Sequence, residues 1–211
     1  MTPPRRPGPA DFADLSRTAT EGVDFRRELR RIGSGVAHIA VHGGGIEPGT
    51  GEAADTVASA NGQDYYAFKA LRSSGNQALH LTSTRFDDPD CLELLRSCAR
   101  TVSYHGCAGD APIVHLGGRD AALRRRIGEA LADAGFVVDW HTAEDLDGSD
   151  RRNICNRNAS GAGVQLELSA ALRASFFPGG RTSRPVRESG ERTAAFRAFV
   201  TAVARTTASA G

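Results

Sequence analysis

The sequence predicts one α/β domain built on a mainly parallel or mixed central sheet that is covered by helices. Two observations lead to this class. The chain has 211 residues, 40% of them hydrophobic, which is enough for one core without disulfide or metal support. Short apolar runs also alternate with segments of helical spacing through most of the chain. We expect the domain to span residues 11–205, with disorder at 1–10 and fraying at 206–211.

The first half of the domain contains the clearest central strand. The run VAHIAV at 36–41 is rich in β-branched side chains and ends at a glycine triplet, as buried strands often do. Before it we expect a helix and an alternating strand, at 11–20 and 23–31. After it we expect a helix, two strands and a helix that begins near the capping residue Asp88, at 52–60, 64–70, 78–81 and 89–98.

The second half continues the alternation of strand and helix. Short strands at 101–104 and 112–116 lead to His105-Gly106 and to Gly117-Gly118. After them, Leu123, Ile127 and Leu131 keep helical spacing up to the stop signal Gly135. A strand, a long polar segment, another strand and a closing helix are expected at 136–139, 142–160, 164–168 and 192–204. A polar segment as long as 142–160 is often functional in a compact domain.

Composition excludes several kinds of partner. Lysine and arginine number 26 against 25 aspartates and glutamates, so the charge indicates no nucleic-acid partner. No apolar run approaches the ~18 residues of a membrane span, and no signal-peptide core follows the first arginines. We expect a monomer without nucleic-acid or membrane partners, located in the cytoplasm or released by lysis or a non-standard route.

The four cysteines form no CxxC pair, which disfavours a zinc ribbon or a thioredoxin-type redox site. We expect them to be buried thiols. A disulfide between Cys107 and Cys155 stays open, because both flank segments that we place at the site.

Two candidate metal ligands follow the strand at 36–41. His42 comes directly after it and Glu47 five residues later, with a flexible glycine-rich stretch between them. Zinc binds histidine nitrogen and carboxylate oxygen, and a hydrolytic site usually keeps three protein ligands and one open position for water. The alternatives are a structural turn or a phosphate-binding loop, although neither GK[ST] nor GxGxxG follows the glycines.

The third ligand has to come from elsewhere in the chain. Sheet enzymes place their sites at the carboxyl ends of strands, and His105 is the best candidate because the strand at 101–104 ends there beside a glycine. His115 is its competitor. We expect the remaining histidines, His38, His80 and His141, to be structural or surface residues.

A carboxylate interrupts the apolar pattern of the strand at 164–168. Glu167 shares a face with Gln165, so it either pairs with a buried arginine or faces a cleft with a function. The preceding loop adds amide and guanidinium donors suited to a carboxylate: Asn153, Asn156, Arg157 and Asn158. The residues alone leave functional and structural roles of this loop equally open.

Several of these segments together resemble the poly-γ-glutamate hydrolase family, known from phage enzymes that degrade bacterial capsules. They are EGVDFR, HGGGIEPGT, SYHG and NICNRNASGAGVQLELS, within about residues 21–173. HGGGIEPGT with the downstream NRN and QLELS is specific in combination, whereas SYHG alone is weak. The resemblance implies an open α/β fold similar to zinc carboxypeptidases, a single Zn²⁺, and hydrolysis of γ-glutamyl amide bonds in an anionic polymer.

Carried over residue by residue, the resemblance implies that His42, Glu47 and His105 bind zinc. It also implies that Glu167 is the general base that takes a proton from a water activated by zinc. The first two ligands are spaced HxxxxE, as in the γ-glutamate hydrolases, whereas carboxypeptidases have HxxE.

The Asn156-Arg157 pair looks like the substrate-carboxylate clamp of the carboxypeptidases, with Arg157 as the anchor. Two other functions stay open, because such sheets host many activities. One is a zinc amidase acting on small γ-glutamyl or N-acyl amino acids. The other is an inactive binding module of the same fold.

Overall fold

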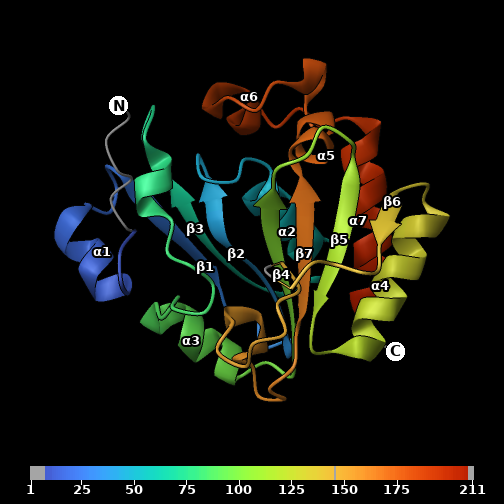
Figure 1. Ribbon diagram of the computed structural model, residues 1–211, viewed down its shortest axis with the longest axis horizontal. Coiled ribbons are helices and arrows are strands. Elements are labelled where there is room, and N and C mark those ends of the chain that lie inside the picture. The colour runs from blue at the N-terminus through green and yellow to red at the C-terminus, as the bar shows by residue number, and fades with distance from the viewer. Residues whose placement is uncertain (1–7, 145, 209–211) are drawn as a thin grey trace.

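A computed structural model describes residues 8–144 and 146–208 and is built around a seven-stranded mixed sheet (Figure 1). The strand order is β1-β3-β2-β4-β7-β5-β6. β1 is antiparallel to β3 and β5 is antiparallel to β7, while the other neighbours are parallel. The predicted α/β class is therefore confirmed. The strands are Phe25–Arg30 (β1), Val36–Gly44 (β2), Asp64–Ala70 (β3), Arg100–Cys107 (β4), Ile113–Gly118 (β5), Val137–Asp139 (β6) and Val164–Ser169 (β7).

Helices cover both faces of the sheet. α2, α4 and α7 pack on one face, and α1 and α3 lie on the other (Figure 1). None of the helices within the described ranges is long and apolar enough to cross a membrane. The helices are α1 (Phe12–Thr18), α2 (Thr50–Asn61), α3 (Pro89–Arg96), α4 (Ala121–Asp133), α5 (Ala170–Ser175), α6 (Arg184–Glu188) and α7 (Ala194–Thr207), with 3-10 turns η1 (Asn76–Leu79), η2 (Ile154–Asn156) and η3 (Pro178–Gly180).

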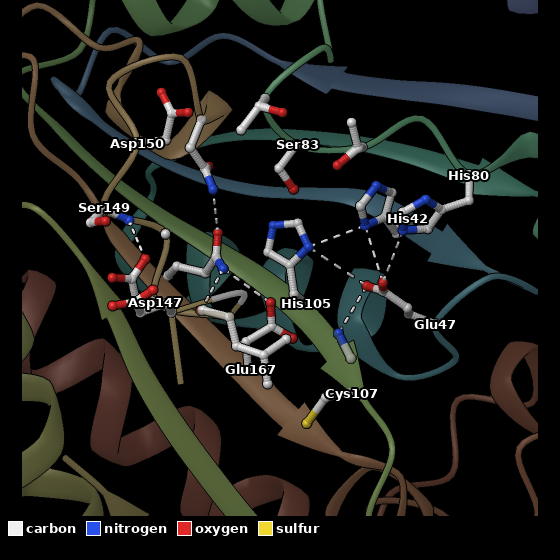
Figure 2. Close-up of a pocket in the computed structure, with 18 of the residues that line it drawn as sticks. His42, Glu47, His80, Ser83, His105, Cys107, Asp147, Ser149, Asp150 and Glu167 are labelled. Carbon is white, nitrogen blue, oxygen red and sulfur yellow. Dashed lines mark hydrogen bonds and ion pairs between the residues drawn. The ribbon is translucent and has the colours of Figure 1, made fainter. Parts of the chain in front are cut away.

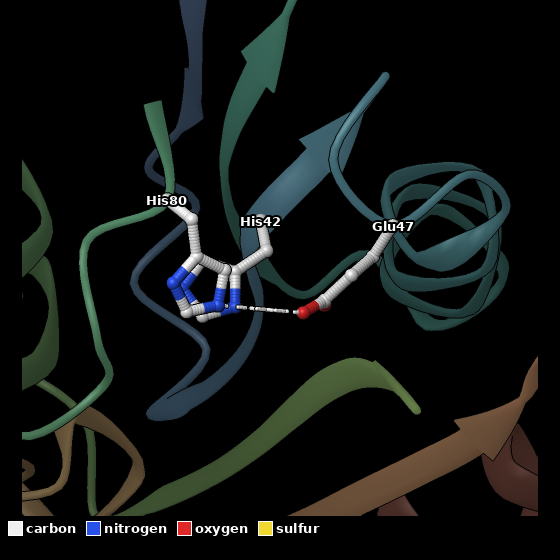
Figure 3. Close-up of side chains that lie close together, drawn as sticks. All are labelled: His42, Glu47 and His80. Atoms are coloured by element: carbon white, nitrogen blue, oxygen red, sulfur yellow. Dashed lines mark ion pairs between the residues drawn. The ribbon is translucent and has the colours of Figure 1, made fainter. Parts of the chain in front are cut away.

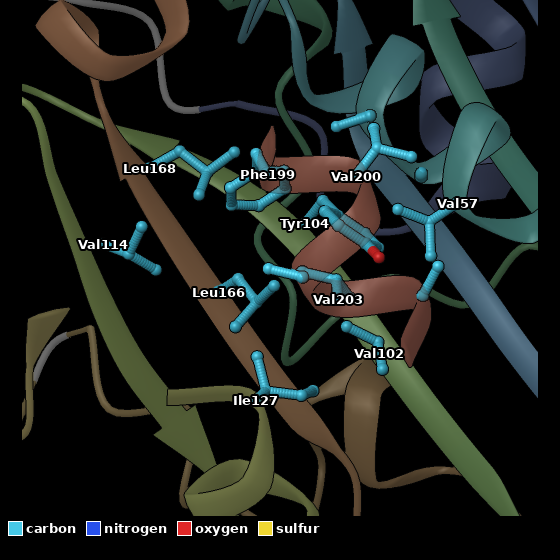
Figure 4. Close-up of a cluster of buried hydrophobic side chains, with 14 of the residues drawn as sticks. Val57, Val102, Tyr104, Val114, Ile127, Leu166, Leu168, Phe199, Val200 and Val203 are labelled. Atoms are coloured by element: carbon cyan, nitrogen blue, oxygen red, sulfur yellow. The ribbon is translucent and has the colours of Figure 1, made fainter. Parts of the chain in front are cut away.

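The larger core cluster fills the space between the sheet and α2, α4 and α7 (Figure 4). The helical spacing of Leu123, Ile127 and Leu131 is confirmed, because all three are buried in this cluster. The Asp120 side chain caps α4 by accepting the N–H of Leu123 at 2.9 Å. Each fully buried leucine or isoleucine contributes roughly 1.5–3 kcal/mol, so α4 is held on the sheet mainly by these side chains.

The prediction of a strand at 78–81 is wrong. η1 occupies Asn76–Leu79 and the chain continues as a loop. Leu79 and Leu81 are buried while His80 between them is partly exposed, an alternation that imitates a strand. Both edges of the neighbouring β3 are already paired, with β1 and β2, so β3 has no edge for this segment.

Several element boundaries differ from those predicted. β2 and β4 extend to Gly44 and Cys107, so His42 and His105 lie inside strands and not after them. α7 continues through Thr207, whose backbone oxygen accepts a hydrogen bond from the Gln63 amide at 2.6 Å. Helices α5 and α6 were not predicted. The terminal segments expected to be disordered or frayed fall largely on residues 1–7 and 209–211, outside the described residues.

Candidate metal centre and active-site cleft

His42, His105 and Glu167 lie on three adjacent strands, β2, β4 and β7, near their carboxyl ends. His105 is paired in register with Glu167, so both side chains leave the sheet on the same face. Val41 packs into the core on that face, and simple alternation would direct His42 to the opposite one. A register shift in β2 between Ala40 and Gly43 instead turns His42 toward His105.

The glycine-rich loop returns Glu47 to the same place. The N–H of Glu47 donates to the backbone oxygen of His42 at 2.9 Å, which closes the loop. Gly44 has φ +69° and lies so close to Ala70 that a Cβ would clash with its backbone, so only glycine fits there. The Glu47 carboxylate accepts the N–H of Gly106 at 2.8 Å, which fixes it beside β4.

The donor atoms of these residues converge in a cleft (Figure 2). His42 Nδ1 lies 3.1 Å from Glu47 Oε1 and 3.1 Å from His105 Nδ1. His105 Nδ1 lies 3.8 Å from Glu47 Oε2. Ligand atoms of a tetrahedral zinc ion, each about 2.0–2.2 Å from the metal, are roughly 3.3 Å from one another. The three groups therefore fit one ion.

The outer hydrogen bonds of the two histidines direct Nδ1 toward this common point. His42 Nε2 is 2.8 Å from the Leu81 carbonyl oxygen; this oxygen can only accept, so Nε2 carries a hydrogen and, in the neutral ring, Nδ1 presents a lone pair. Ser103 Oγ lies 2.8 Å from His105 Nε2. The Nδ1 lone pair of neutral His42 lies 3.1 Å from a carboxylate oxygen, a repulsive contact that either a proton on Nδ1 or a metal ion between the two atoms would remove. The donor set therefore suits a divalent ion.

The pKa values of the two histidines are shifted in opposite directions. Burial alone would lower the pKa of His42, but the charge and hydrogen bond of Glu47, the Leu81 carbonyl and the charge of Glu167 together outweigh burial and raise it, so a metal ion would have to displace a proton from His42. Burial lowers the pKa of His105 to about 3, so this imidazole is neutral at pH 7, as a metal ligand must be.

His80 belongs to the same cluster, although we expected it to be a structural or surface residue. Its ring stacks on that of His42, with centroids 3.9 Å apart and planes at 26° (Figure 3). Its Nε2 lies 3.8 Å from Glu47 Oε1, and the ligand atoms of His42, Glu47 and His80 all lie within 4.8 Å of one another. His80 comes from the loop after η1 and not from a strand end, so strand-end reasoning could not find it.

Glu167 lines the cleft beside these groups and is 6% exposed. The Gln165 amide donates to Glu167 Oε1 at 3.0 Å, and the Gln165 oxygen accepts from the Asn153 amide at 2.9 Å. The shared face of Gln165 and Glu167 is therefore part of the cleft wall. The long polar segment orients the Gln165 side chain through the hydrogen bond from Asn153.

The predicted carboxylate clamp is not brought to this cleft. The Asn156 amide donates to the backbone oxygens of Gly148 and Asp150 at 2.8 and 2.9 Å, and its oxygen accepts the N–H of Gly163 at 3.0 Å. Asn156 thus supports the loop that forms one wall. Arg157 is exposed and does not line the cleft, so its role as substrate anchor stays a prediction without geometric support.

We expect Asn156→Ala to lower stability and not substrate binding. It leaves three backbone groups without their partner, at about 2–4 kcal/mol in total, or roughly 5–15 °C in Tm for a domain of this size. Thermal unfolding and KM measured on one preparation check this. Arg157→Ala is the matched control and should leave Tm unchanged. A clear rise in KM for Arg157→Ala would restore the anchor role.

The cleft has a volume of about 570 Å³. Hydroxyl and amide groups line much of it, and Glu144, Asp147 and Asp150 add acidic side chains; among the described residues, no lysine or arginine lines it. Arg173 lies behind the wall, where its guanidinium donates to the backbone oxygens of Leu168, Pro48 and Cys107 at 3.0–3.1 Å.

Two further sequence candidates are resolved by the structure. His115, the competitor for the third ligand, lies 2.7 Å from Asp139 through its Nδ1 atom and is outside the cleft. Cys107 and Cys155 are free thiols, so the disulfide left open by the sequence is not formed.

Fold and site together define an open-sheet α/β protein with a histidine- and carboxylate-lined cleft at the carboxyl ends of parallel strands. The chain belongs to the poly-γ-glutamate hydrolase family, whose model matches residues 10–202. A bacteriophage poly-γ-glutamate hydrolase has a similar structure, with a TM-score of 0.90 and 34% identity, covering 93% of this chain and 94% of that one. A zinc-free apo form of YndL gives a TM-score of 0.87 and 30% identity, covering 93% and 95%.

Curated relatives come from Bacillus subtilis strain 168. The SPβ prophage-derived UPF0714 protein YoqZ is 39% identical over 140 residues, which cover 66% of this chain and 50% of YoqZ. The UPF0714 protein YndL is 35% identical over 155 residues, which cover 73% of this chain and 61% of YndL. The chain thus spans between half and about three-fifths of the length of these relatives.

Proposed function

We propose that this chain is a zinc-dependent hydrolase that cleaves the γ-glutamyl amide bonds of poly-γ-glutamate. The observation that carries the proposal is the convergence of His42, Glu47 and His105 donor atoms beside the buried carboxylate of Glu167 in one cleft. Family membership supports the substrate class. The zinc-free state of the YndL structure makes zinc the first ion to test.

The ring orientations favour His105 over His80 as the third firm ligand. The rings of His42 and His105 are inclined at 70°, with their Nδ1 atoms facing each other, so their lone pairs converge. The rings of His42 and His80 are stacked within 26°, so their lone pairs run nearly side by side. His42, Glu47 and His105 would therefore hold the ion.

When bound, zinc would supply the Lewis acidity that activates a water molecule and polarises the amide carbonyl. Glu167 would accept the proton of that water and later give it to the leaving amine. Gln165 holds Glu167 Oε1 through its amide N–H, which fixes the direction of the carboxylate. The hydroxyls of Thr82, Ser83 and Thr84 along the cleft wall would orient the polar groups of the substrate.

The acidic wall favours a second candidate, a zinc amidase that acts on small γ-glutamyl substrates. Glu144, Asp147 and Asp150 line the cleft, and their negative charge would repel successive carboxylates of a polyanion. A short substrate presents fewer carboxylates to this wall. If this candidate is correct, a γ-glutamyl dipeptide will be cleaved faster than the polymer at equal bond concentration.

We expect the purified protein to contain one zinc ion per chain and to shorten poly-γ-glutamate, because the cleft offers one set of converging ligands. A divalent-metal chelator should stop the reaction and added zinc should restore it. Metal content by elemental analysis and polymer length by size-exclusion chromatography check both points. Unchanged hydrolysis after complete zinc removal would contradict the proposal, as would intact polymer with the zinc-loaded protein.

A further inference from the structure

We infer that His80 is an exchangeable fourth ligand that completes the metal site in the resting protein and leaves it when substrate enters. The inference rests on the proposed zinc site. It assigns a role to a residue outside the firm ligand set of His42, Glu47 and His105.

Distance places His80 within reach of the same ion. His80 Nε2 is 3.8 Å from Glu47 Oε1, the same separation as between His105 Nδ1 and Glu47 Oε2. The ligand atoms of His42, Glu47 and His80 all lie within 4.8 Å of one another, and an imidazole nitrogen is a usual zinc ligand. His80 therefore lies within reach of an ion bound by His42 and Glu47.

His80 is held less firmly than the other three groups. Its side chain is 36% exposed, against 3% for His42, 10% for Glu47 and 3% for His105. It lies on the loop after η1. The contact of η1 with the glycine-rich loop is made by Gln77, whose amide donates to the Ile46 oxygen at 3.1 Å. Stacking on His42 keeps the His80 ring near the site, but the ring has to tilt to aim its lone pair. It is thus the weakest of the four ligands.

Exchange of this ligand has a chemical consequence. Sites closed by four protein ligands are typical of structural zinc, whereas catalytic sites keep one position for water or substrate. With His80 in place, four protein ligands would hold the metal and leave no open position. Release of His80 would make its position available to water or substrate.

The test compares zinc-loaded wild type with His80→Phe, which keeps a flat ring for stacking on His42 but removes the nitrogen donor. Zinc affinity is measured by competition with a chromogenic chelator, and the coordination number by visible absorption of the cobalt-substituted protein. We expect His80→Phe to bind zinc about 10-fold more weakly, the smallest loss typical of a weakened zinc site, and to shift the cobalt spectrum. His115→Phe is the control from outside the cleft and should match wild type.

The outcomes separate this inference from the proposed function. If His80→Phe matches wild type in zinc affinity and cobalt spectrum, His80 is not a ligand. Weak binding by His80→Ala together with normal binding by His80→Phe would show that only stacking matters and would also overturn the inference. If His80→Phe does not fold, the cobalt spectrum of His80→Ala decides the question. Failure of wild type to bind zinc would instead overturn the proposed metal site.

Discussion

Replacing His42 or His105 by alanine is expected to abolish hydrolysis of poly-γ-glutamate while leaving the fold in place. Each substitution removes one of three converging donors, and two remaining ligands do not hold zinc firmly. Both side chains line the cleft, whereas the buried His38 does not, so we expect Tm to change by only a few degrees. Zinc content, Tm and turnover measured on the same preparation check the prediction.

His38→Ala is the matched control, because His38 lies on the same strand four residues before His42. His38 is fully buried and hydrogen-bonded to Tyr104 Oη at 2.9 Å and to Gln63 Oε1 at 2.8 Å. Its loss should lower Tm and leave the zinc content of the folded protein normal, the opposite pattern. Full activity of either His42→Ala or His105→Ala would show that the ligand assignment is wrong.

Glu167→Gln should lower turnover by roughly 10²-fold or more, the scale of general-base assistance. Glutamine keeps the size of the side chain and an oxygen that can accept the Gln165 amide, but it cannot take a proton from water. Zinc content and Tm should therefore stay close to those of wild type. Steady-state kinetics on poly-γ-glutamate, together with metal analysis and thermal unfolding, test this expectation.

The same three measurements distinguish the other roles that a buried carboxylate can have. Loss of zinc from Glu167→Gln would indicate a metal ligand, and a large drop in Tm with modest loss of turnover per folded molecule would indicate a structural group. Normal turnover with normal zinc would remove Glu167 from the mechanism. Gln165→Leu is a useful companion, because it removes the hydrogen bond to Glu167, together with those to Asn153 and Leu146, but keeps the carboxylate itself, and it should reduce turnover by less.

Sequence patterns predicted those features that depend on interactions between residues close together in the chain. The helix of Leu123, Ile127 and Leu131 and the cap at Asp88 follow from spacing and from capping chemistry, and both are present as predicted. The alternation in β7 placed Gln165 and Glu167 on one face before any neighbour was known. The glycine-rich loop similarly indicated that His42 and Glu47 could meet.

Contacts between segments far apart in the chain could not be predicted from these local patterns. Residues 78–81 alternate like a strand, yet β3 had no edge left for them, which only the sheet order reveals. His80 reaches the site through the loop that follows η1, and its distance from Glu47 depends on how that loop packs. Asn156 and Arg157 have the chemistry of a carboxylate clamp, but Asn156 is used to hold the loop backbone and Arg157 is exposed.

The sequence by itself therefore determined the α/β class and most helices and strands, because spacing, capping and side-chain chemistry act over short stretches of chain. The candidate ligands His42, Glu47 and His105 and the candidate base Glu167 came from the family resemblance, because short-range patterns left His105 and Glu167 open. The tertiary structure alone decided that His80 joins that centre, that Asn156 and Arg157 do not, and that the cleft wall is acidic. These outcomes depend on strand order, on the register shift in β2 and on loop packing, all of which arise from contacts between residues far apart in the chain.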